Sequence, residues 1–360
     1  MPTLHALLPE TVRDLTRPSG GNTYDTRLLT ELRGLGWRVE EHLVAGRWPV
    51  PDAAGRRSLG EAAARPPTGG LVLVDGILAS GSPEVLVPLA RRASLVVLVH
   101  LPLGGAGELA VLRAASAVIT TSAWSRDRLL ELHGLHGLHG SVGARVRVVE
   151  PGVDPAPLAA GTPAGGGLLC VGAVTPLKGQ DLLVDALGSL TDLPWRCVCA
   201  GSLEIDGPFA DEVVRRARAA GIADRVTFTG PLRSEELADA YASADLLVQP
   251  SRVETYGMVV TEALARAVPV AASSAGGLPS TLRGPSGEGD ADRTVDATDL
   301  PGFLVAAGSS PALAAGLRTW LTDAGLRDRL RQSAAARRPR LLPWSGTARH
   351  VAALLAALPD

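Results

Sequence analysis

Lysine is almost absent from this chain of 360 residues, which holds one Lys, Lys178, against thirty-four Arg. The two cations do not replace each other at a binding site, because the ammonium group is a compact point charge and the guanidinium is a planar fork. Lys178 lies in the segment VTPLKGQD, between an apolar run and a stretch with helical spacing. Its position between two elements makes it a candidate binding residue.

Other residue types and patterns are also scarce, and each shortage excludes a class of protein. Only three Cys occur, and Cys197 and Cys199 alternate in WRCVCAG, which predicts packing in a strand and a reducing, cytoplasmic setting. A net charge of −2 and few aromatic residues give no case for binding nucleic acid. No apolar run approaches the ~20 residues that cross a bilayer, and no helix of the first half combines basic and aromatic residues for docking on a membrane. The first residues lack a charged start followed by an apolar stretch, so no secretory leader is expected.

The pattern that is present alternates short apolar runs with stretches of helical spacing. Such alternation predicts parallel sheets with helical crossovers. The predicted strands are 3–8, 71–75, 95–100, 116–120 and 145–149, then 167–171, 196–200, 225–229, 245–249 and 268–272.

A segment rich in Pro and Gly, at residues 151–166, separates the two series of strands and predicts a linker between two α/β domains. We expect a first domain over 1–155, a second over 156–342, and a carboxyl-terminal helix over 343–360 that packs back toward the first. Ligands of such sheets bind in the crevice at the carboxyl ends of the strands, and two facing sheets would place that crevice between the domains.

The second half holds a pair of carboxylates around a helix start. In QPSRVETYGMVVTEAL, Glu254 lies in the predicted strand-to-helix loop and Glu262 lies on the helix. The first helical amides, near Gly257, are free to bind a diphosphate. Two carboxylates beside such a cradle suit a ligand with hydroxyl groups on either side of its phosphates, as in a sugar nucleotide.

These residues resemble the retaining glycosyltransferases of GT-B type, often called family 4, whose motif is Glu-x7-Glu. The similarity extends over nearly the whole chain, through LLCVGAVTPLKGQDLLVDAL, RVTFTGPLRSEELADAYASADLLVQPS, GGLPSTL, EPGVD and, more weakly, RPSGGNTYDTRLLTELRGLGWRV. It implies two Rossmann-like, doubly wound parallel-sheet domains facing each other across a cleft. It also implies transfer of a hexosyl group from a UDP- or GDP-linked sugar to a hydroxyl acceptor, with retention and without a metal or another cofactor.

The resemblance assigns roles residue by residue. Lys178 would contact the donor diphosphate, Glu254 the sugar hydroxyls and Glu262 the ribose. Catalytic roles would fall to His100, Glu254 and Lys178. The remaining donor contacts would come from Gly20, Gly21, Thr255, Tyr256, Gly257, Met258 and Val259, and the acceptor would meet Asn22, Thr23, Tyr24, His100 and the loop 75–82.

The chain departs from that family at two positions that bear on the site. Many members have Arg where this chain has Ala173, and Glu where it has Ser280. Lys178 is therefore expected to be the main cation on the diphosphate, with Arg252 as a possible helper. The segments HGLHGLHG (His133, His136, His139) and Asp290-x-Asp292 are read as loops rather than metal sites.

Two alternatives of the same architecture remain open at this point. One is a nucleotide-sugar epimerase, which needs no second substrate, and the other is a nucleotide-sugar-binding protein without catalysis. A nicotinamide-dependent dehydrogenase and a Walker-type hydrolase are disfavoured, because neither glycine pattern follows a predicted strand. The sequence does not indicate an oligomeric state.

Overall fold

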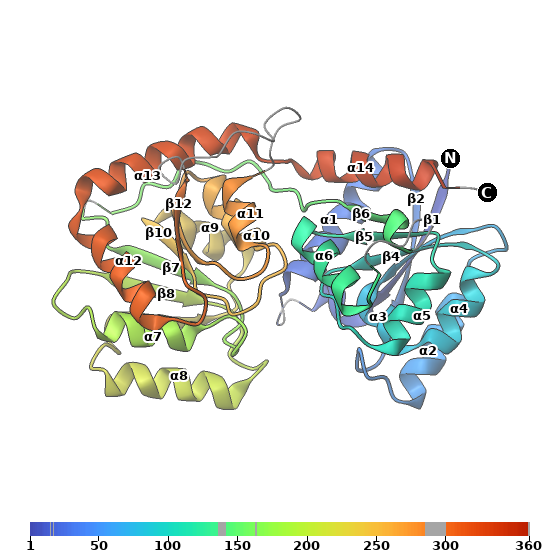
Figure 1. The fold of residues 1–360 in the computed structure, drawn as a ribbon, viewed down its shortest axis with the longest axis horizontal. Coiled ribbons are helices and arrows are strands. Elements are labelled where there is room, and N and C mark those ends of the chain that lie inside the picture. Colours follow the sequence, from blue (N-terminus) through green and yellow to red (C-terminus); the bar gives the residue numbers. More distant parts are fainter. Residues whose placement is uncertain (15, 17, 136–141, 163, 285–299, 359–360) are drawn as a thin grey trace. The chain divides into compact units, whose positions relative to one another are not determined.

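The computed structural model describes residues 1–14, 16, 18–135, 142–162, 164–284 and 300–358. The chain divides into two compact units. Unit 1 comprises Met1–Asp14, Gly20–Gly152 and Leu342–Asp360, and unit 2 comprises the rest of the chain, chiefly Val153–Leu341. Each unit is built on one six-stranded parallel sheet with helices on both faces (Figure 1).

The sheet of unit 1 has the strand order β2-β1-β3-β4-β5-β6. Its strands are β1 (Thr3–Pro9), β2 (Arg38–Val44), β3 (Leu71–Asp75), β4 (Ser94–Val99), β5 (Ala117–Thr120) and β6 (Val146–Val148). Its helices are α1 (Gly20–Gly34), α2 (Ala53–Ala63), α3 (Gly76–Gly81), α4 (Pro83–Ala90), α5 (Ala106–Ala114), α6 (Ala123–Leu132) and α14 (Trp344–Ala356), with 3-10 turns at Glu10–Arg13 and Val142–Arg145.

The sheet of unit 2 has the strand order β12-β11-β10-β7-β8-β9. Its strands are β7 (Gly167–Val171), β8 (Arg196–Ala200), β9 (Val226–Gly230), β10 (Leu246–Gln249), β11 (Val270–Ser273) and β12 (Gly302–Val305). Its helices are α7 (Gln180–Gly188), α8 (Gly207–Ala219), α9 (Ser234–Ala242), α10 (Met258–Leu264), α11 (Leu278–Arg283), α12 (Ser310–Thr322) and α13 (Ala324–Arg337), with a 3-10 turn at Arg338–Arg340.

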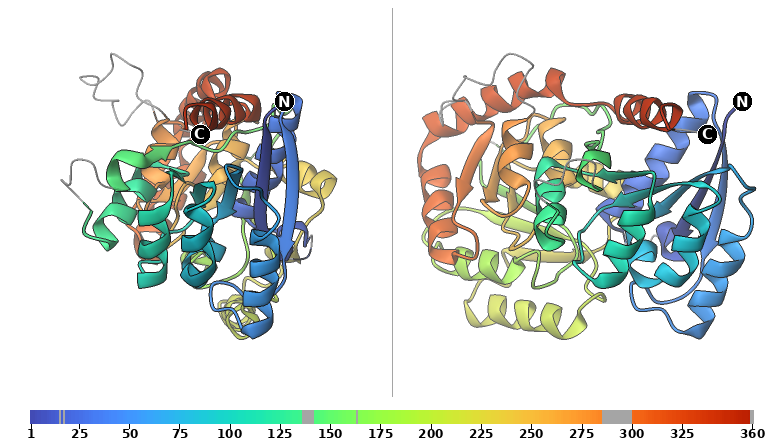
Figure 2. Two further views of the ribbon diagram at one scale, coloured as in Figure 1. Left: turned by 90° about the vertical axis from the view of Figure 1, so that its right-hand side faces the viewer. Right: turned by 45° about the vertical axis from the view of Figure 1, so that its right-hand side comes forward.

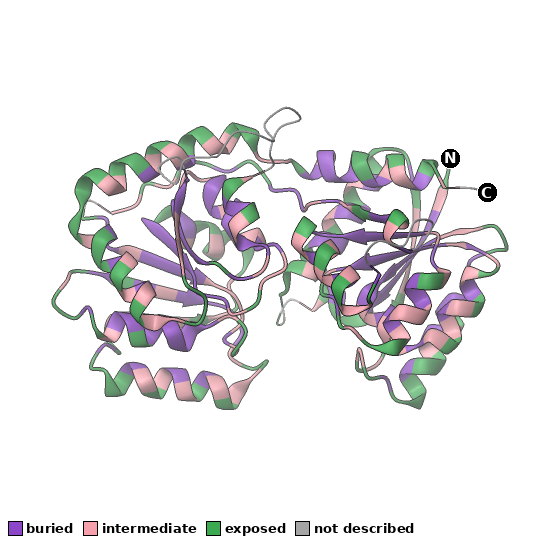
Figure 3. Ribbon diagram, viewed as in Figure 1, coloured by how far each residue is buried: buried purple, intermediate pink, exposed green. Residues whose placement is uncertain are grey.

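The central strands are buried on both faces, which is why they appear in the sequence as continuous apolar runs (Figure 3). In unit 1 alternate strand residues such as Leu7 and Val97 join one core cluster with side chains of α2 to α6. In unit 2 one cluster draws mainly on α7, α8 and α12, and another on α9, α10 and α11. The parallel arrangement gathers the loops that follow the strands at one edge of each sheet.

The carboxyl-terminal helix α14 belongs to unit 1, where it packs against α1 (Figure 2). Trp344, 4% exposed, meets the ring of Tyr24 edge-on with centroids 5.7 Å apart. Gly152 allows this contact, because an added Cβ would lie 2.4 Å from the backbone nitrogen of Trp344. The last helix therefore completes the core of the first unit.

Two strands escape the sequence prediction, and both are edge strands. β2 carries the polar sequence RVEEHLV with one fully buried residue, and β12 is the short run GFLV. An edge strand is covered less completely than a central one, so neither forms the long apolar run that marks a buried strand. The ten predicted strands all occur, with bounds that match or differ by at most two residues.

The three Cys are free and buried, as the alternation in WRCVCAG indicates. Among the described residues, no helix has the length and apolar character needed to span a bilayer.

Candidate active site

Lys178 and Glu254 meet at the carboxyl edge of the sheet in unit 2. Lys178 lies in the loop from β7 to α7, and Glu254 lies in the loop from β10 to α10. The two strands are neighbours, so their loops lie side by side. The Lys178 Nζ donates to Glu254 Oε2 at 2.6 Å, with a third of the lysine side chain exposed. The sequence thus places its lone ammonium group against a carboxylate 76 residues further along the chain.

Arg252 stabilises the loop that carries Lys178, here called the lysine loop. Its guanidinium forms a bidentate pair with Asp181, at 2.8 and 2.7 Å, and also donates to the carbonyl of Pro176. Burial would raise the pKa of Asp181, but the hydrogen bonds and charge of Arg252 lower it overall. Arg252 therefore positions the loop that carries Lys178, and its expected help at a phosphate stays a prediction.

The loop of Glu254 is packed against the Gly-Gly segment of residues 276 and 277. Gly276 has φ +57°, and a Cβ there would lie 1.9 Å from the carbonyl oxygen of Glu254. The amide of Gly277 donates to that same oxygen at 2.8 Å. The absence of side chains at these two positions lets the GGLPSTL loop fix the backbone of Glu254.

Gly257 begins α10 in the left-handed region, with φ +90°. The amides of Gly257, Met258 and Val259 have no hydrogen-bond partner among the residues the structure describes. Thr255 and Tyr256 precede them, and Thr281 Oγ1 donates to the Tyr256 carbonyl at 2.6 Å. These amides can therefore donate hydrogen bonds to an anion that binds beside the Lys178–Glu254 pair.

Glu262 lies on α10, where Tyr241 of α9 donates its hydroxyl to Oε2 at 2.9 Å. Burial raises the pKa of Glu262, and the hydrogen bond from Tyr241 opposes that rise. Arg266 stacks on the Tyr241 ring at 4.6 Å. The sequence pattern gave no sign of Tyr241, because its partner lies on another helix.

The two positions that depart from the family pattern have local partners. The carbonyl of Ala173 accepts from Gln180 Nε2 at 3.1 Å, and the Ser280 hydroxyl donates to the carbonyl of Gly277. Neither position supplies a charge, so the cations in the described parts of the loops after β7 and β10 are Lys178 and Arg252.

In unit 1 the expected first loop is partly helical, because Gly20 and Gly21 are the first residues of α1. A Cβ on Gly21 would lie 3.1 Å from Cδ2 of His100, so glycine lets this imidazole lie directly against the helix. The expected loop 75–82 is also mostly helix: Asp75 ends β3 and caps α3, where its Oδ1 accepts a hydrogen bond from the Ile77 amide at 2.7 Å.

The expected acceptor residues lie in the first turns of α1 and just after β4. Asn22 donates to the carbonyl of Thr11 at 3.0 Å, and Thr23 is exposed. Tyr24 is 1% exposed, and its hydroxyl donates to the carbonyl of Val149. Its use inside the unit leaves the expected acceptor contact of Tyr24 without support.

His100 follows β4 and has a partner that sequence reasoning missed. Its Nε2 lies 2.8 Å from Oδ1 of Asp25, a buried carboxylate of α1. Asp75 lies close to both groups. Burial alone would lower the pKa of His100, but the charge and hydrogen bond of Asp25 and the charge of Asp75 raise it to about 9. The pattern that could have revealed Asp25 is its position one residue after Tyr24 on a helix face that is otherwise apolar.

Two groups of described residues have the spacing of metal ligands: His5, Glu40 and His42, and Asp25, Asp75 and His100. In each group the atoms are joined by hydrogen bonds, at 3.1 Å between the imidazoles of His5 and His42 in the first. The expectation that the enzyme needs no metal stays a prediction.

The other histidine and aspartate motifs divide between described and undescribed residues. His133 lies in the turn that follows α6, where its side chain is 3% exposed and its Nε2 lies 2.8 Å from Glu108 Oε2. His136, His139, Asp290 and Asp292 lie outside the described residues.

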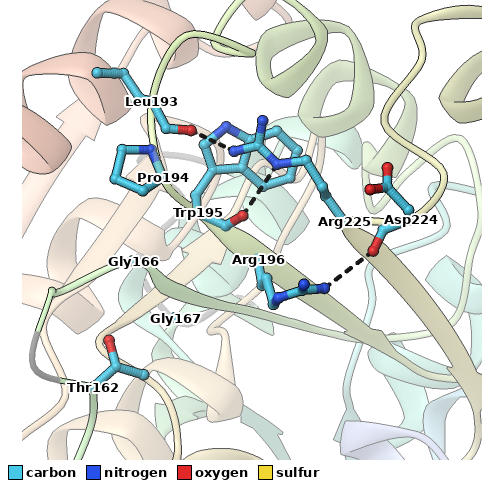
Figure 4. Close-up of a pocket in the computed structure, with 9 residues that line it drawn as sticks. All are labelled: Thr162, Gly166, Gly167, Leu193, Pro194, Trp195, Arg196, Asp224 and Arg225. Carbon is cyan, nitrogen blue, oxygen red and sulfur yellow. Dashed lines mark hydrogen bonds between the residues drawn. The ribbon is translucent and has the colours of Figure 1, made fainter.

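A cavity of about 570 Å³ opens at the other end of the sheet in unit 2 (Figure 4). Gly167 and Arg196, the first residues of β7 and β8, line it together with Trp195 and Arg225. The guanidinium of Arg225 stacks on the Trp195 ring at 3.8 Å. Because this is the amino-terminal edge of the strands, the cavity is separate from the Lys178–Glu254 site, where a parallel sheet binds ligands.

Solved structures show the same fold at low sequence identity. The sucrose-phosphate synthase (tll1590) of Thermosynechococcus elongatus is 20% identical, with a TM-score of 0.76 over 99% of this chain and 98% of that one. Anabaena Alr3699/HepE, solved in complex with UDP and glucose, is 19% identical, with a TM-score of 0.72 over 98% of this chain and 99% of that one. These likenesses establish the GT-B fold, with its two Rossmann-like sheets.

Curated relatives are more similar in sequence but longer. The D-inositol 3-phosphate glycosyltransferase of Kineococcus radiotolerans is 35% identical over 262 residues, which cover 67% of this chain and 57% of that protein. The protein of that name from Mycobacterium sp. (strain KMS) is 36% identical over 194 residues, covering 51% of this chain and 42% of its own length. The chain thus spans about half the length of the curated relatives it matches.

The family model described as "Glycosyl transferases group 1" matches residues 167–337, which hold Lys178, Glu254 and Glu262. The family, the fold and the loop geometry agree. The segment 167–337 therefore belongs to the glycosyl transferases group 1 family.

Proposed function

We propose that the protein is a retaining glycosyltransferase that moves a hexosyl group from a nucleoside diphosphate sugar to a hydroxyl acceptor without a metal. The observation that carries the proposal is the 2.6 Å contact between Lys178 and Glu254 beside the open amides of Gly257, Met258 and Val259. One cation, one carboxylate and several amides at one edge of a sheet match the charges and hydroxyl groups of a sugar diphosphate.

In this proposal the ion pair between Lys178 and Glu254 separates when the donor binds. A bound diphosphate would draw Lys178 away from Glu254, and the freed carboxylate would accept hydrogen bonds from sugar hydroxyls. Glu262, half-buried and held by Tyr241, would accept from the ribose. Each group keeps a hydrogen-bonding partner in both states, so donor binding would leave no buried charge unpaired.

Charge development then favours transfer. When the bond from the anomeric carbon to the diphosphate breaks, the sugar becomes oxocarbenium-like and the leaving group gains negative charge. Lys178 and the amides at the start of α10 are already in place to stabilise that charge. The departing phosphate would accept the proton of the acceptor hydroxyl on the same face of the sugar, which gives retention.

We also propose the chemical class of the donor and of the acceptor. Structures similar in fold were solved with UDP, with UDP-glucose and with ADP, which supports a nucleotide-sugar donor. For the acceptor we propose a small soluble hydroxyl compound held by unit 1. Because the curated relatives are named D-inositol 3-phosphate glycosyltransferases, D-inositol 3-phosphate is one compound to include in a screen.

The test is a thermal-shift screen over UDP, GDP and ADP sugars, followed by product analysis of the donors that bind. A ligand at 100 times its Kd adds ~2.7 kcal/mol to the free energy of unfolding, so a productive donor raises the melting temperature clearly. With an acceptor such as D-inositol 3-phosphate, we expect a glycoside with the donor's anomeric configuration and release of the nucleoside diphosphate. An isomerised nucleotide sugar formed from donor alone would show an epimerase instead, and binding without turnover would show a binding protein.

A further inference from the structure

Three titratable side chains meet at the carboxyl edge of the sheet in unit 1. Asp75 ends β3, His100 follows the neighbouring strand β4, and Asp25 reaches them from α1. Their nearest ligand-type atoms all lie within 4.8 Å of one another, and the shortest link is the 2.8 Å contact of His100 Nε2 with Asp25 Oδ1. Three charges of this kind cannot be placed so close without sharing protons.

Both carboxyl groups are removed from water. Asp25 is 1% exposed and Asp75 is 6% exposed. Asp25 Oδ2 is buried and accepts no hydrogen bond from any described donor, whereas Asp75 Oδ1 accepts from the Ile77 amide. A buried carboxylate oxygen without a donor is costly. A proton held on Asp75 and directed at Asp25 Oδ2 would supply the missing hydrogen bond.

We propose that Asp25 and Asp75 hold one proton between them and keep His100 as an imidazolium, so that His100 serves the reaction as a fixed cation and hydrogen-bond donor. With two protons on three groups the cluster has no net charge, which is the state that burial favours. Asp25 and Asp75 are positioning residues in this scheme, because they act through His100. The role of His100 in transfer rests on the proposed function, whereas its charge does not.

The electrostatics of the cluster agree with this proton count. Burial, followed by the charge of Asp25, raises the pKa of Asp75 to about 7. The pKa of His100 is raised to about 9. At pH 7 the imidazole is therefore charged, and Asp75 is about half protonated.

The surroundings of His100 leave one ring nitrogen for a ligand. Besides Asp25 and Asp75, the titratable group that faces the ring is Tyr24, which lies edge-on at 5.4 Å and donates its hydroxyl to Val149. Nε2 is taken by Asp25, while Nδ1 has no hydrogen-bond partner among the described residues. The side chain is 18% exposed, and Gly21 presents no side chain over it. An imidazolium here offers an Nδ1–H donor and has no lone pair with which to act as a general base.

The test is a pH titration of histidine labelled with ¹⁵N, with His100 assigned by its loss in His100→Gln. In the unliganded wild type we expect two protonated ring nitrogens at pH 7.5 and a titration near pH 9. Asp25→Asn should lower that titration by about two pH units, toward the ordinary value near 6.5. Asp75→Asn replaces the protonated carboxyl by a group of the same shape, so it should leave His100 charged.

Three results would overturn the proton count. They are a wild-type titration near or below 6.5, an unchanged titration in Asp25→Asn, and loss of the His100 signals on adding one equivalent of Zn²⁺, which would make the cluster a metal site. The wild-type measurement needs no variant to fold. A charged His100 whose Gln variant retains full transfer activity would overturn the catalytic role alone, and would leave both the proton count and the proposed transferase activity standing.

Discussion

At the scale of single residues, the protein depends on one ammonium group. Lys178 reaches Glu254 at 2.6 Å, and no other lysine exists to take its place. A guanidinium is larger and planar, so an arginine at this position would not present the same compact charge to Glu254. We therefore expect the proposed chemistry at the donor phosphates to require this side chain itself.

Lys178→Ala should lower kcat for transfer by about 100-fold, because one preorganised interaction with a leaving group is typically worth ~3 kcal/mol. Lys178→Arg should recover little of that loss. Initial-rate kinetics with a saturating donor measure both. Arg233→Ala is the matched control, since it removes an exposed cation of the same unit that pairs with Glu236 at 3.2 Å. Activity of Lys178→Ala within a few-fold of wild type would remove Lys178 from the mechanism.

Residue types and their spacing predicted Lys178, Glu254 and Glu262 but not their partners. Tyr241 lies on a different helix from Glu262, and Asp25 lies 75 residues before His100. Asp181 follows Lys178 by three residues, but the sequence does not show that it pairs with Arg252. Arg252 was visible as a nearby charge, but only the fold shows that it is already paired. A sequence pattern reports which groups follow a strand, whereas pairing depends on which strands are neighbours.

At the scale of elements, the lysine loop is a short connection whose shape is set by a neighbouring loop. Gly179 caps α7 with φ +74°, and a Cβ there would lie 2.3 Å from the carbonyl oxygen of Pro250. The amide of Arg252 donates to the carbonyl of Leu177 at 2.8 Å. The loop after β7 and the loop after β10 therefore behave as one structural piece.

Asp181→Asn should loosen that piece by breaking the bidentate pair with Arg252. The folded pKa of Asp181 is below its ordinary value, so the pair stabilises above that value and is lost as the pH falls through the folded pKa. At pH 7 we therefore expect the full effect, a loss of about 1 kcal/mol in stability and a raised KM for donor. Donor kinetics at pH 7 check this, with Asp192→Asn, which breaks an exposed pair with Arg318, as the control. An unchanged KM would separate the pair from the lysine loop.

Helix α14 is the last element of the chain and completes the first unit. Trp344→Ala would empty its buried contact with Tyr24 and should cost about 3 to 5 kcal/mol. Hydrogen exchange of peptides from α1 measures the loss inside unit 1. Trp320→Ala, at a buried tryptophan of unit 2, is the matched control and should leave those peptides protected. Equal protection of α1 in both variants would contradict this role of α14.

Two edge strands, β2 and β12, could not be predicted from the sequence. β1, β3, β4 and β5 are covered on both faces and appear as apolar runs, whereas β2 has six of its seven residues at least partly exposed on an edge. The exposed residues of an edge strand are under little pressure to be apolar. Their presence has to be inferred from the sheet they complete.

At the scale of the whole molecule, two α/β units carry separate sets of candidate residues. Unit 2 holds the donor set around Lys178, and unit 1 holds His100 with its two carboxyl partners. The restart of the strand pattern after residue 166 predicted two sheets. Which residues each unit would present to a substrate depended on the carboxyl edges of those sheets.

Stability of unit 1 should fall as the pH rises from about 7 to about 9. His100 binds its proton more tightly when folded, so its contribution is fully present below its ordinary pKa and is lost as the pH rises through about 9. The expected loss is of the order of 2 kcal/mol. Hydrogen exchange of unit 1 peptides, corrected for the intrinsic pH dependence, measures it, and His100→Gln should flatten the slope. A slope that survives in that variant would assign the effect to another group.

The proposed contact of Lys178 with the donor diphosphate can be tested directly, because the chain has one lysine. Reductive methylation with ¹³C-formaldehyde labels the amine of Lys178 and the amino terminus, and Lys178→Arg identifies which signal belongs to the lysine. The nucleoside diphosphate sugar that gives the largest thermal shift is then added. We expect the chemical shift of the Lys178 methyl signal to change on binding, because the amine leaves Glu254 for the diphosphate. A donor that stabilises the protein while this signal stays unchanged would contradict it.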